Sequence, residues 1–218
     1  MVSGQLEVFW VRIPDSYCTS FKSHISNLIS RISYLTSQIS YPMRKLKLDE
    51  LNRASVDEFK LLKKFPVVVV LDNVRSMHNV GSIFRTADGF AVEQLYLCGI
   101  TAQPPHREIE KTALGATQSV NWTYCADVVE AIEGLRARQY HIIAVEQAED
   151  SIMLQDFEIR PGEKYALVFG NEVNGVTQEV MNRIEACIEI PQFGTKHSFN
   201  IVVSAGIVLW DLFSKMIG

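Results

Sequence analysis

The chain has 218 residues, of which 47% are hydrophobic and 21% charged, and its formal net charge is −4. This balance is typical of a soluble globular protein with one well-buried core. Its longest apolar runs are far shorter than the roughly 20 residues that span a bilayer, and residues 1–18 lack the basic and apolar segments of a secretory signal, so we expect a cytoplasmic protein without a membrane anchor.

Residues 1–42 differ from the rest of the chain. Nine of them are serine, and their isoleucines recur at irregular spacing, so a helix over about residues 21–40 has no evident core to pack on. We predict that residues 1–42 are a poorly packed extension. Because Met43 opens a more regular segment, we also hypothesise that it is the natural start and that residues 1–42 are an upstream translation.

Residues 43–65 predict an amphipathic basic leader helix. Its apolar positions are Leu46, Leu48, Leu51, Phe59 and Leu62. The segment has seven basic and four acidic side chains, whereas residues 66–218 sum to −8. Either the leader helps to hold a polyanion such as RNA, or it is an ordinary solvated helix; charge alone favours the second interpretation.

From residue 66 onward, strand-like and helix-like segments alternate. We predict strands at 67–71, 94–97, 120–124, 141–145, 165–169 and 186–190, and helices at 81–89, 107–114, 126–138, 177–184 and 199–216. Valine- and isoleucine-rich strands that alternate with helices indicate an α/β fold with a mostly parallel sheet and helices on both faces. Four scattered cysteines without a CxxC pair predict reduced thiols in a cytosolic protein, with neither disulfides nor a metal site.

The stretch HNVGSIFRTAD, residues 78–88, follows the first predicted strand. Asn79 is a good helix N-cap, and a core stripe follows at Val80, Ile83, Phe84 and Ala87. Arg85 lies off that stripe, where it could stand over the end of the strand and bind a phosphate or a developing oxyanion. A surface salt bridge is the plainer alternative for this arginine.

A second stretch, VFGNEVNGV at residues 168–176, places Glu172 between Gly170 and Gly175. Glycines at such positions let the backbone come close to a ligand or adopt positive φ. Glu172 is expected near the first turn of the following helix, where the helix dipole favours a carboxylate. A helix-capping role without any chemistry is the alternative.

A third stretch runs from residue 188 to residue 210. A predicted strand runs into Pro191, and a loop that contains Gly194 follows. Ser198 and Asn200 then open a helix that is apolar on all sides over residues 201–210 except at Ser204. A helix that is hydrophobic all round must be buried on more than one face. We therefore expect it to be buried partly in the core and partly at a subunit interface.

These three motifs together resemble the SpoU/TrmH branch of the SPOUT RNA methyltransferases. The branch has Asn-x-Gly-x-x-x-Arg, then Gly-x-Glu-x-x-Gly, then Ile-Pro-x-x-Gly followed by Ser-Leu-Asn-Val. The matching residues are Asn79, Gly81, Arg85, Gly170, Glu172, Gly175, Ile190, Pro191, Gly194, Ser198 and Asn200. Phe199 and Ile201 stand for the usual leucine and valine. The resemblance covers residues 66–218, and three motifs in order are far more specific than any one of them.

The resemblance implies a deep C-terminal trefoil knot, a homodimer, and S-adenosylmethionine bound by the knotted loops. The implied cofactor-binding residues are Gly170, Ile190, Gly194 and Phe199. The implied reaction is methyl transfer to a ribose 2′-hydroxyl in tRNA or rRNA, without a metal. Since arginine stays charged in proteins, we expect the implied catalytic arginine to stabilise the nascent alkoxide and hold a phosphate rather than act as a base.

The other implied site residues support that arginine, Arg85. Asn79 would orient Arg85 or the RNA, and Glu172 would fix its loop or a neighbouring arginine. Ser198 and Asn200 would shape the last loop and contact substrate. The basic residues considered for RNA contact are Arg44, Lys45, Lys47, Arg107 and Lys111, although Arg107 and Lys111 fit an ordinary solvated helix start about equally well.

Three other functions remain open from the sequence. One is a non-catalytic RNA-binding subunit on the same fold, which the intact motifs disfavour. Another is a related knotted methyltransferase that acts on a base atom or on protein. The third is a nucleotide-binding oxidoreductase, disfavoured because no GxGxxG follows an early strand. The sequence does not identify the RNA or the modified nucleotide.

Overall fold

The structure is a computed structural model that describes residues 25–34 and 43–217. The chain divides into two compact units, residues 1–53 and residues 54–218. In the first unit, residues 25–34 form a helix with exposed side chains, and a short 3₁₀ helix, η1, spans Leu48–Leu51. The helix predicted over residues 21–40 is confirmed at its centre, and its two ends lie outside the described residues. That residues 1–42 are a non-native extension stays a prediction.

The prediction of one helix over residues 43–65 is wrong. After η1, Asn52 adopts a left-handed conformation (φ 46°), and a separate helix, α2, spans Val56–Leu61. A capping box explains the new start: Ser55 Oγ accepts from the amide of Glu58 at 3.3 Å, and the Glu58 carboxylate accepts from the amide of Ser55 at 2.8 Å. The capping residues, rather than the amphipathic pattern, therefore determine where α2 begins.

The second unit is built on a seven-stranded sheet in the order β3-β2-β1-β6-β4-β7-β5, in which every described pairing is parallel. The strands are β1 (Phe65–Asp72), β2 (Val92–Cys98), β3 (Trp122–Cys125), β4 (Tyr140–Val145), β5 (Ile152–Met153), β6 (Lys164–Phe169) and β7 (Ala186–Glu189). The α/β fold with a mostly parallel sheet is confirmed. All six predicted strands are present; β5 was not predicted, since two residues leave no readable period.

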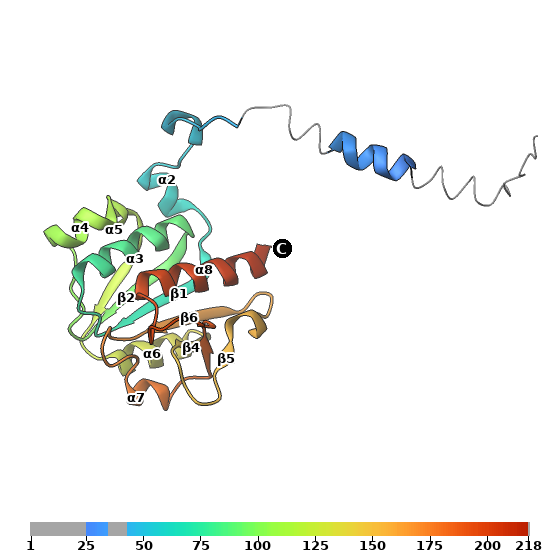
Figure 1. The fold of residues 1–218 in the computed structure, drawn as a ribbon. Helices are drawn as coiled ribbons and strands as arrows, with labels where there is room; N and C mark the ends of the chain where they lie inside the picture. Colours follow the sequence, from blue (N-terminus) through green and yellow to red (C-terminus); the bar gives the residue numbers. More distant parts are fainter. Residues whose placement is uncertain (1–24, 35–42, 218) are drawn as a thin grey trace, which may run out of the picture. The chain divides into compact units, whose positions relative to one another are not determined.

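Helices cover both faces of the sheet (Figure 1). They are α3 (Met77–Gly89), α4 (Arg107–Ala113), α5 (Ala116–Ser119), α6 (Val128–Ala137), α7 (Gln178–Met181) and α8 (Ile201–Ile217), with a short 3₁₀ helix η2 (Leu154–Asp156). Helices α3, α4, α5 and α8 share one core with Val67, Val69 and Leu71 of β1. Helices α6 and α7 share the opposite core with Val68 and Val70. This alternation explains why β1 is apolar at nearly every position.

The apolar residues of α3 and α8 are buried to different extents. The stripe predicted for α3 (Val80, Ile83, Phe84 and Ala87) is fully buried. Helix α8 buries Ile201, Ala205, Val208, Leu209 and Leu212 but leaves Val203, Trp210 and Ile217 exposed. Within the chain, α8 is thus buried on one side and keeps an apolar strip on the other.

Parallel strand order decides which loops meet. Val145 at the end of β4 is in register with Phe169 of β6 and Ile188 of β7, and Leu71 of β1 is in register with Phe169. The segments that follow these four strands therefore leave the sheet at the same edge, which is where open α/β sheets bind ligands.

Two further properties concern the described part of the chain. No helix within residues 25–34 and 43–217 is long and apolar enough to cross a membrane, and no group of His, Cys, Asp or Glu there could hold a metal ion. Cys98, Cys125 and Cys187 are free thiols, the first and last of them buried. Cys18 lies outside the described residues.

Candidate active site

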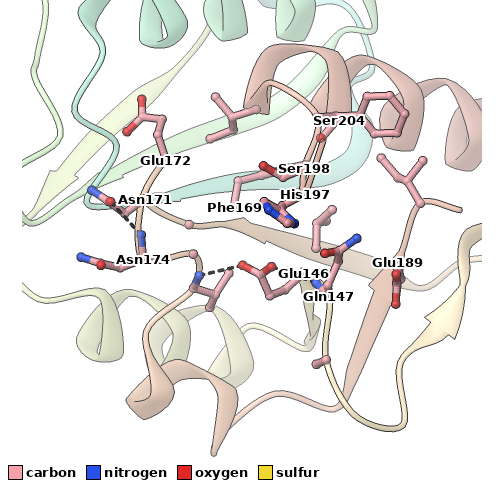
Figure 2. A pocket seen from close by; sticks show the side chains of 18 of the residues that line it. Glu146, Gln147, Phe169, Asn171, Glu172, Asn174, Glu189, His197, Ser198 and Ser204 are labelled. Carbon is pink, nitrogen blue, oxygen red and sulfur yellow. Dashed lines mark hydrogen bonds between the residues drawn. The ribbon is translucent and has the colours of Figure 1, made fainter. Parts of the chain in front are cut away.

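A cavity of about 830 Å³ opens at the carboxyl ends of β4, β6 and β7 (Figure 2). Four segments supply most of its wall: residues 145–149, 169–176, 188–190 and 197–201. Its volume is in the range of sites that enclose a small molecule or cofactor. The second and third sequence motifs thus meet around one hollow, together with the segment that follows β4.

The loop after β6 is closed on itself. Asn171 and Gly175 exchange two backbone hydrogen bonds of 2.9 Å each, and Asn171 Oδ1 accepts from the amides of Val173 and Asn174. A Cβ on Gly170 would lie 2.0 Å from the carbonyl carbon of Gly175, so only glycine fits there. The motif glycines therefore serve to close the loop that forms this wall.

Glu172 points out of this loop toward the start of α3. Its carboxylate accepts from the amides of Arg75 and Ser76, each at 3.0 Å, and from Asn79 Nδ2 at 2.9 Å. The predicted position of Glu172 near the first turn of its own following helix is wrong, because α7 begins only at Gln178. Instead Glu172 satisfies free donors at the amino end of α3, a helix formed almost a hundred residues earlier.

These contacts determine how Glu172 ionises. Burial opposes its negative charge and by itself would raise its pKa. The hydrogen bonds that the carboxylate accepts outweigh burial, so the pKa of Glu172 is lowered below its ordinary value. Glu172 is therefore held as a carboxylate at neutral pH.

Asn79 is not the N-cap of α3, contrary to the prediction. Ser76 has that place, and its side chain accepts from the amide of Asn79 at 3.3 Å. The side chain of Asn79 is thereby free to bridge the other two motifs: its Nδ2 donates to Glu172, and its Oδ1 accepts from Asn200 Nδ2 at 3.3 Å. Asn200 in turn caps α8 by accepting from the amide of Val202 at 2.9 Å.

Gly81 has a packing role. A Cβ at this position would lie 2.2 Å from both the carbonyl oxygen of Ile109 and Oγ1 of Thr112. Thr112 Oγ1 also donates to the carbonyl of His78 at 3.1 Å, which ties α4 to the first turn of α3. The glycine of the first motif thus lets α4 approach α3 closely.

Arg85 lies on the exposed face of α3, off the core stripe as predicted. It is not among the residues that line the cavity, and its side chain forms no hydrogen bond or ion pair within the described part of the chain. The structure therefore does not bring Arg85 to the cavity wall of its own chain, and its catalytic role stays a prediction.

The remaining predicted site residues differ in whether they line the cavity. Gly170, Ile190, Phe199, Ser198 and Asn200 line the cavity, whereas Gly194 does not. Arg107 and Lys111 are exposed on α4, beside His78, which contacts Glu108 through Nε2 at 2.6 Å.

The predicted RNA contacts in the first unit are all exposed. Arg44, Lys45 and Lys47 face solvent. Arg44 makes two hydrogen bonds to the Glu50 carboxylate, at 2.8 and 2.9 Å, so part of its charge is already paired.

The cavity lining includes polar residues that the sequence did not single out, among them Glu146, Gln147 and Glu189. Glu146 and Gln147 directly follow β4, and Glu189 is the last residue of β7. The usable signal was their place at the carboxyl ends of predicted parallel strands, where functional side chains gather. No spacing rule singled them out: Glu146 and Gln147 stand outside the three motifs, and Glu189 lies in the third stretch but is not one of its motif residues.

Comparisons with known proteins agree on one family. Residues 66–210 match the family model described as "SpoU rRNA Methylase family". A "Putative TrmH family tRNA/rRNA methyltransferase" of Staphylococcus saprophyticus is 28% identical over 74% of this chain and 64% of its own length. The chain thus spans slightly less than two thirds of that relative. The "tRNA (guanosine(18)-2'-O)-methyltransferase" of Thermus thermophilus is also 28% identical, over 74% of this chain and 81% of its own length.

A solved structure shows the same fold. The AdoMet-bound rRNA methyltransferase of Sinorhizobium meliloti superposes with a TM-score of 0.64 and 26% identity, covering 70% of this chain and 58% of that one. The family match over residues 66–210 includes all three motifs and the residues that line the cavity.

Proposed function

The chain belongs to the SpoU rRNA methylase family, and we propose that it transfers the methyl group of S-adenosylmethionine to a ribose 2′-hydroxyl of tRNA or rRNA. The observation that carries the proposal is the hydrogen-bonded chain Glu172–Asn79–Asn200, which joins the three family motifs beside one cavity. The names of the S. saprophyticus and T. thermophilus relatives support an RNA substrate, and the T. thermophilus name supports the 2′-oxygen.

The cavity suits S-adenosylmethionine. Its wall combines apolar side chains at Phe169, Ile188 and Ile190 with carboxylates and with glycine backbone. This combination fits a ligand that has a flat adenine and a cationic end. Gly170, Ile190 and Phe199 would hold the cofactor. When bound, it supplies a methyl group already activated on a sulfonium.

The chain must then align and activate a weakly acidic hydroxyl. We assign Arg85 to stabilise negative charge on the ribose oxygen and to hold the neighbouring phosphate. Ser198 would contact the substrate beside the cavity. Asn79 and Glu172 would act as positioning residues, because their side chains hold one another and the start of α3. Arg107 and Lys111 on α4 would contact RNA phosphates.

The proposal includes a homodimer. The strip on α8 formed by Val203, Trp210 and Ile217 is exposed and apolar. The ring of Trp210 lies tilted against that of Phe90 after α3, with centroids 6.4 Å apart. A second copy would cover these side chains. Since Arg85 does not line the cavity of its own chain, the cavity of either copy could receive it. The knot and the cytoplasmic location belong to the proposal as well.

The second candidate function is an RNA-binding subunit without catalysis, favoured only because Arg85 is not among the residues that line the cavity. Calorimetry separates the two: we expect the purified protein to bind S-adenosylmethionine, and failure to bind it would leave the non-catalytic subunit. Nucleoside analysis of RNA from cells with and without the gene should then find one 2′-O-methyl nucleotide that depends on the gene. A gene-dependent methyl group on a base atom would instead indicate the related base methyltransferase.

A further inference from the structure

The wall of the cavity is acidic. Its lining includes Glu146, Glu149, Glu172 and Glu189, and among the described residues that line it there is no lysine or arginine and His197 is the only basic side chain. A concave site lined by one sign of charge favours ligands of the opposite sign. The cavity wall therefore distinguishes cationic from neutral ligands of similar shape.

Glu146 is the central carboxylate of this set. Glu172 is engaged with the amino end of α3, Glu189 accepts from Ser151 Oγ at 2.7 Å, and Glu149 is exposed to solvent. In Figure 2, Glu146 lies between Glu172 on one side of the view and Glu189 on the other. Glu146 is thus a lining carboxylate that directly follows β4, and no lysine or arginine stands beside it among the described lining residues.

The Glu146 carboxylate is also held rigidly. Its Oε2 accepts from the amide of Val176 at 3.1 Å, and its Oε1 accepts from the amide of Gln147 at 2.8 Å. A Cβ on Gly175 would lie 2.2 Å from Oε2, so the loop packs directly against this oxygen. A charge that is already oriented needs no reorganisation when a ligand binds, which increases its effect on affinity.

We propose that Glu146 makes the cavity select the methyl donor over the product that lacks the sulfonium charge, an inference that rests on the proposed function. In the reaction the bond from sulfur to the methyl carbon breaks, the ribose oxygen bonds that carbon, and the hydroxyl proton passes to water. The sulfonium cation of S-adenosylmethionine thereby becomes the neutral thioether of S-adenosylhomocysteine. A fixed carboxylate attracts the first and not the second, so donor binding and product release are both favoured.

The test is calorimetric titration without RNA, using S-adenosylmethionine, S-adenosylhomocysteine and sinefungin, an analogue with an ammonium-bearing carbon in place of the sulfonium. Wild type is compared with Glu146→Gln, which removes the charge and keeps an oxygen that can accept from Val176. The matched control is Asp127→Asn: Asp127 also accepts a backbone amide, from Val129 at 2.8 Å, but does not line the cavity.

We expect wild type to bind both cationic ligands about fivefold or more tightly than S-adenosylhomocysteine. Glu146→Gln should weaken binding of the cationic pair by about fivefold to tenfold and leave the product within about twofold, with no change in Asp127→Asn. An equal loss for all three ligands would mean that Glu146 only shapes the wall, and the charge selection would be refuted.

The measurement on wild type tests the inference even if Glu146→Gln does not fold. Product binding as tight as donor binding would overturn the inference and leave the proposed function standing. Wild type that binds none of the three ligands would refute the proposed function itself, and this inference with it.

Discussion

Asn79 and Glu172, 93 residues apart, are joined by a hydrogen bond of 2.9 Å from the amide Nδ2 to the carboxylate Oε1. The same carboxylate accepts from two free amides before α3, so the second motif caps the helix that carries the first. Asn200 extends the link to the third motif. The motifs are therefore one connected structure, and damage to one is expected to disturb the others.

Glu172→Ala should lower the free energy of unfolding by about 1–3 kcal/mol, because three donors lose their acceptor. Urea denaturation followed by circular dichroism measures this change. The control is Glu179→Ala, which removes an exposed carboxylate 3.5 Å from Arg183 and should cost about 0.5 kcal/mol or less. Equal losses in the two variants would contradict the capping role of Glu172.

The contribution of Glu172 should also depend on pH. Because its folded pKa is lowered below the ordinary value of 4.5, its stabilisation is fully present above that value and is lost as pH falls through the folded pKa. The difference in unfolding free energy between wild type and Glu172→Gln should thus be constant near neutral pH and shrink in acid. Urea titrations from about pH 7 to about pH 3 check this, and a gap that widens in acid would reverse the assigned sign.

Gly81→Ala should destabilise the protein by about 1–3 kcal/mol, since the added methyl meets backbone at Ile109 and the side chain of Thr112. Gly134→Ala is the matched control within α6, where no atom lies within 4 Å of the added carbon. There the helix should gain about 0.5–1 kcal/mol. Thermal unfolding of the two variants should shift in opposite directions, and shifts of the same sign would argue against close packing at Gly81.

Arg85→Ala should reduce methyl transfer to RNA by about 100-fold or more while leaving the fold and cofactor affinity unchanged, because only charge stabilisation at the oxygen is lost. Single-turnover rates with labelled donor give the effect. Arg160→Ala is the control, since Arg160 is also exposed and lies outside the cavity lining. An unchanged rate in Arg85→Ala would remove Arg85 from the mechanism.

Val203→Asp should weaken the proposed homodimer, because a carboxylate on the apolar strip of α8 would be buried by a second copy. Light scattering coupled to size exclusion should report a monomer, with native circular dichroism. Leu61→Asp is the control: Leu61 of α2 is exposed, and its change should leave the oligomeric state as it was. Identical masses for wild type and Val203→Asp would argue against an interface at this strip.

Some parts of the fold could be read from the sequence and others could not. Continuous runs such as Val67–Leu71 predicted buried parallel strands, and the period of α3 predicted its buried face. The capping residue of α3 was misassigned, because Ser76 and Asn79 are both good capping types and only the tertiary partner of Asn79 distinguishes them. The prediction of one helix over residues 43–65 was wrong for a related reason. The apolar spacing favoured a single helix, but the capping box at Ser55 starts a new one.

By itself, the sequence determined the order of strands and helices, the buried stripe of α3, the three motifs and the membership in a family that they indicate. These are local properties, set by side-chain periodicity and by the few residue types that a tight loop accepts. Only the tertiary structure decided that Glu172 holds the start of α3, that Glu146 stands in the cavity wall, and that Arg85 lies away from it. Those relationships depend on strand order and helix packing, and distant segments meet according to how the whole core closes rather than by any local pattern.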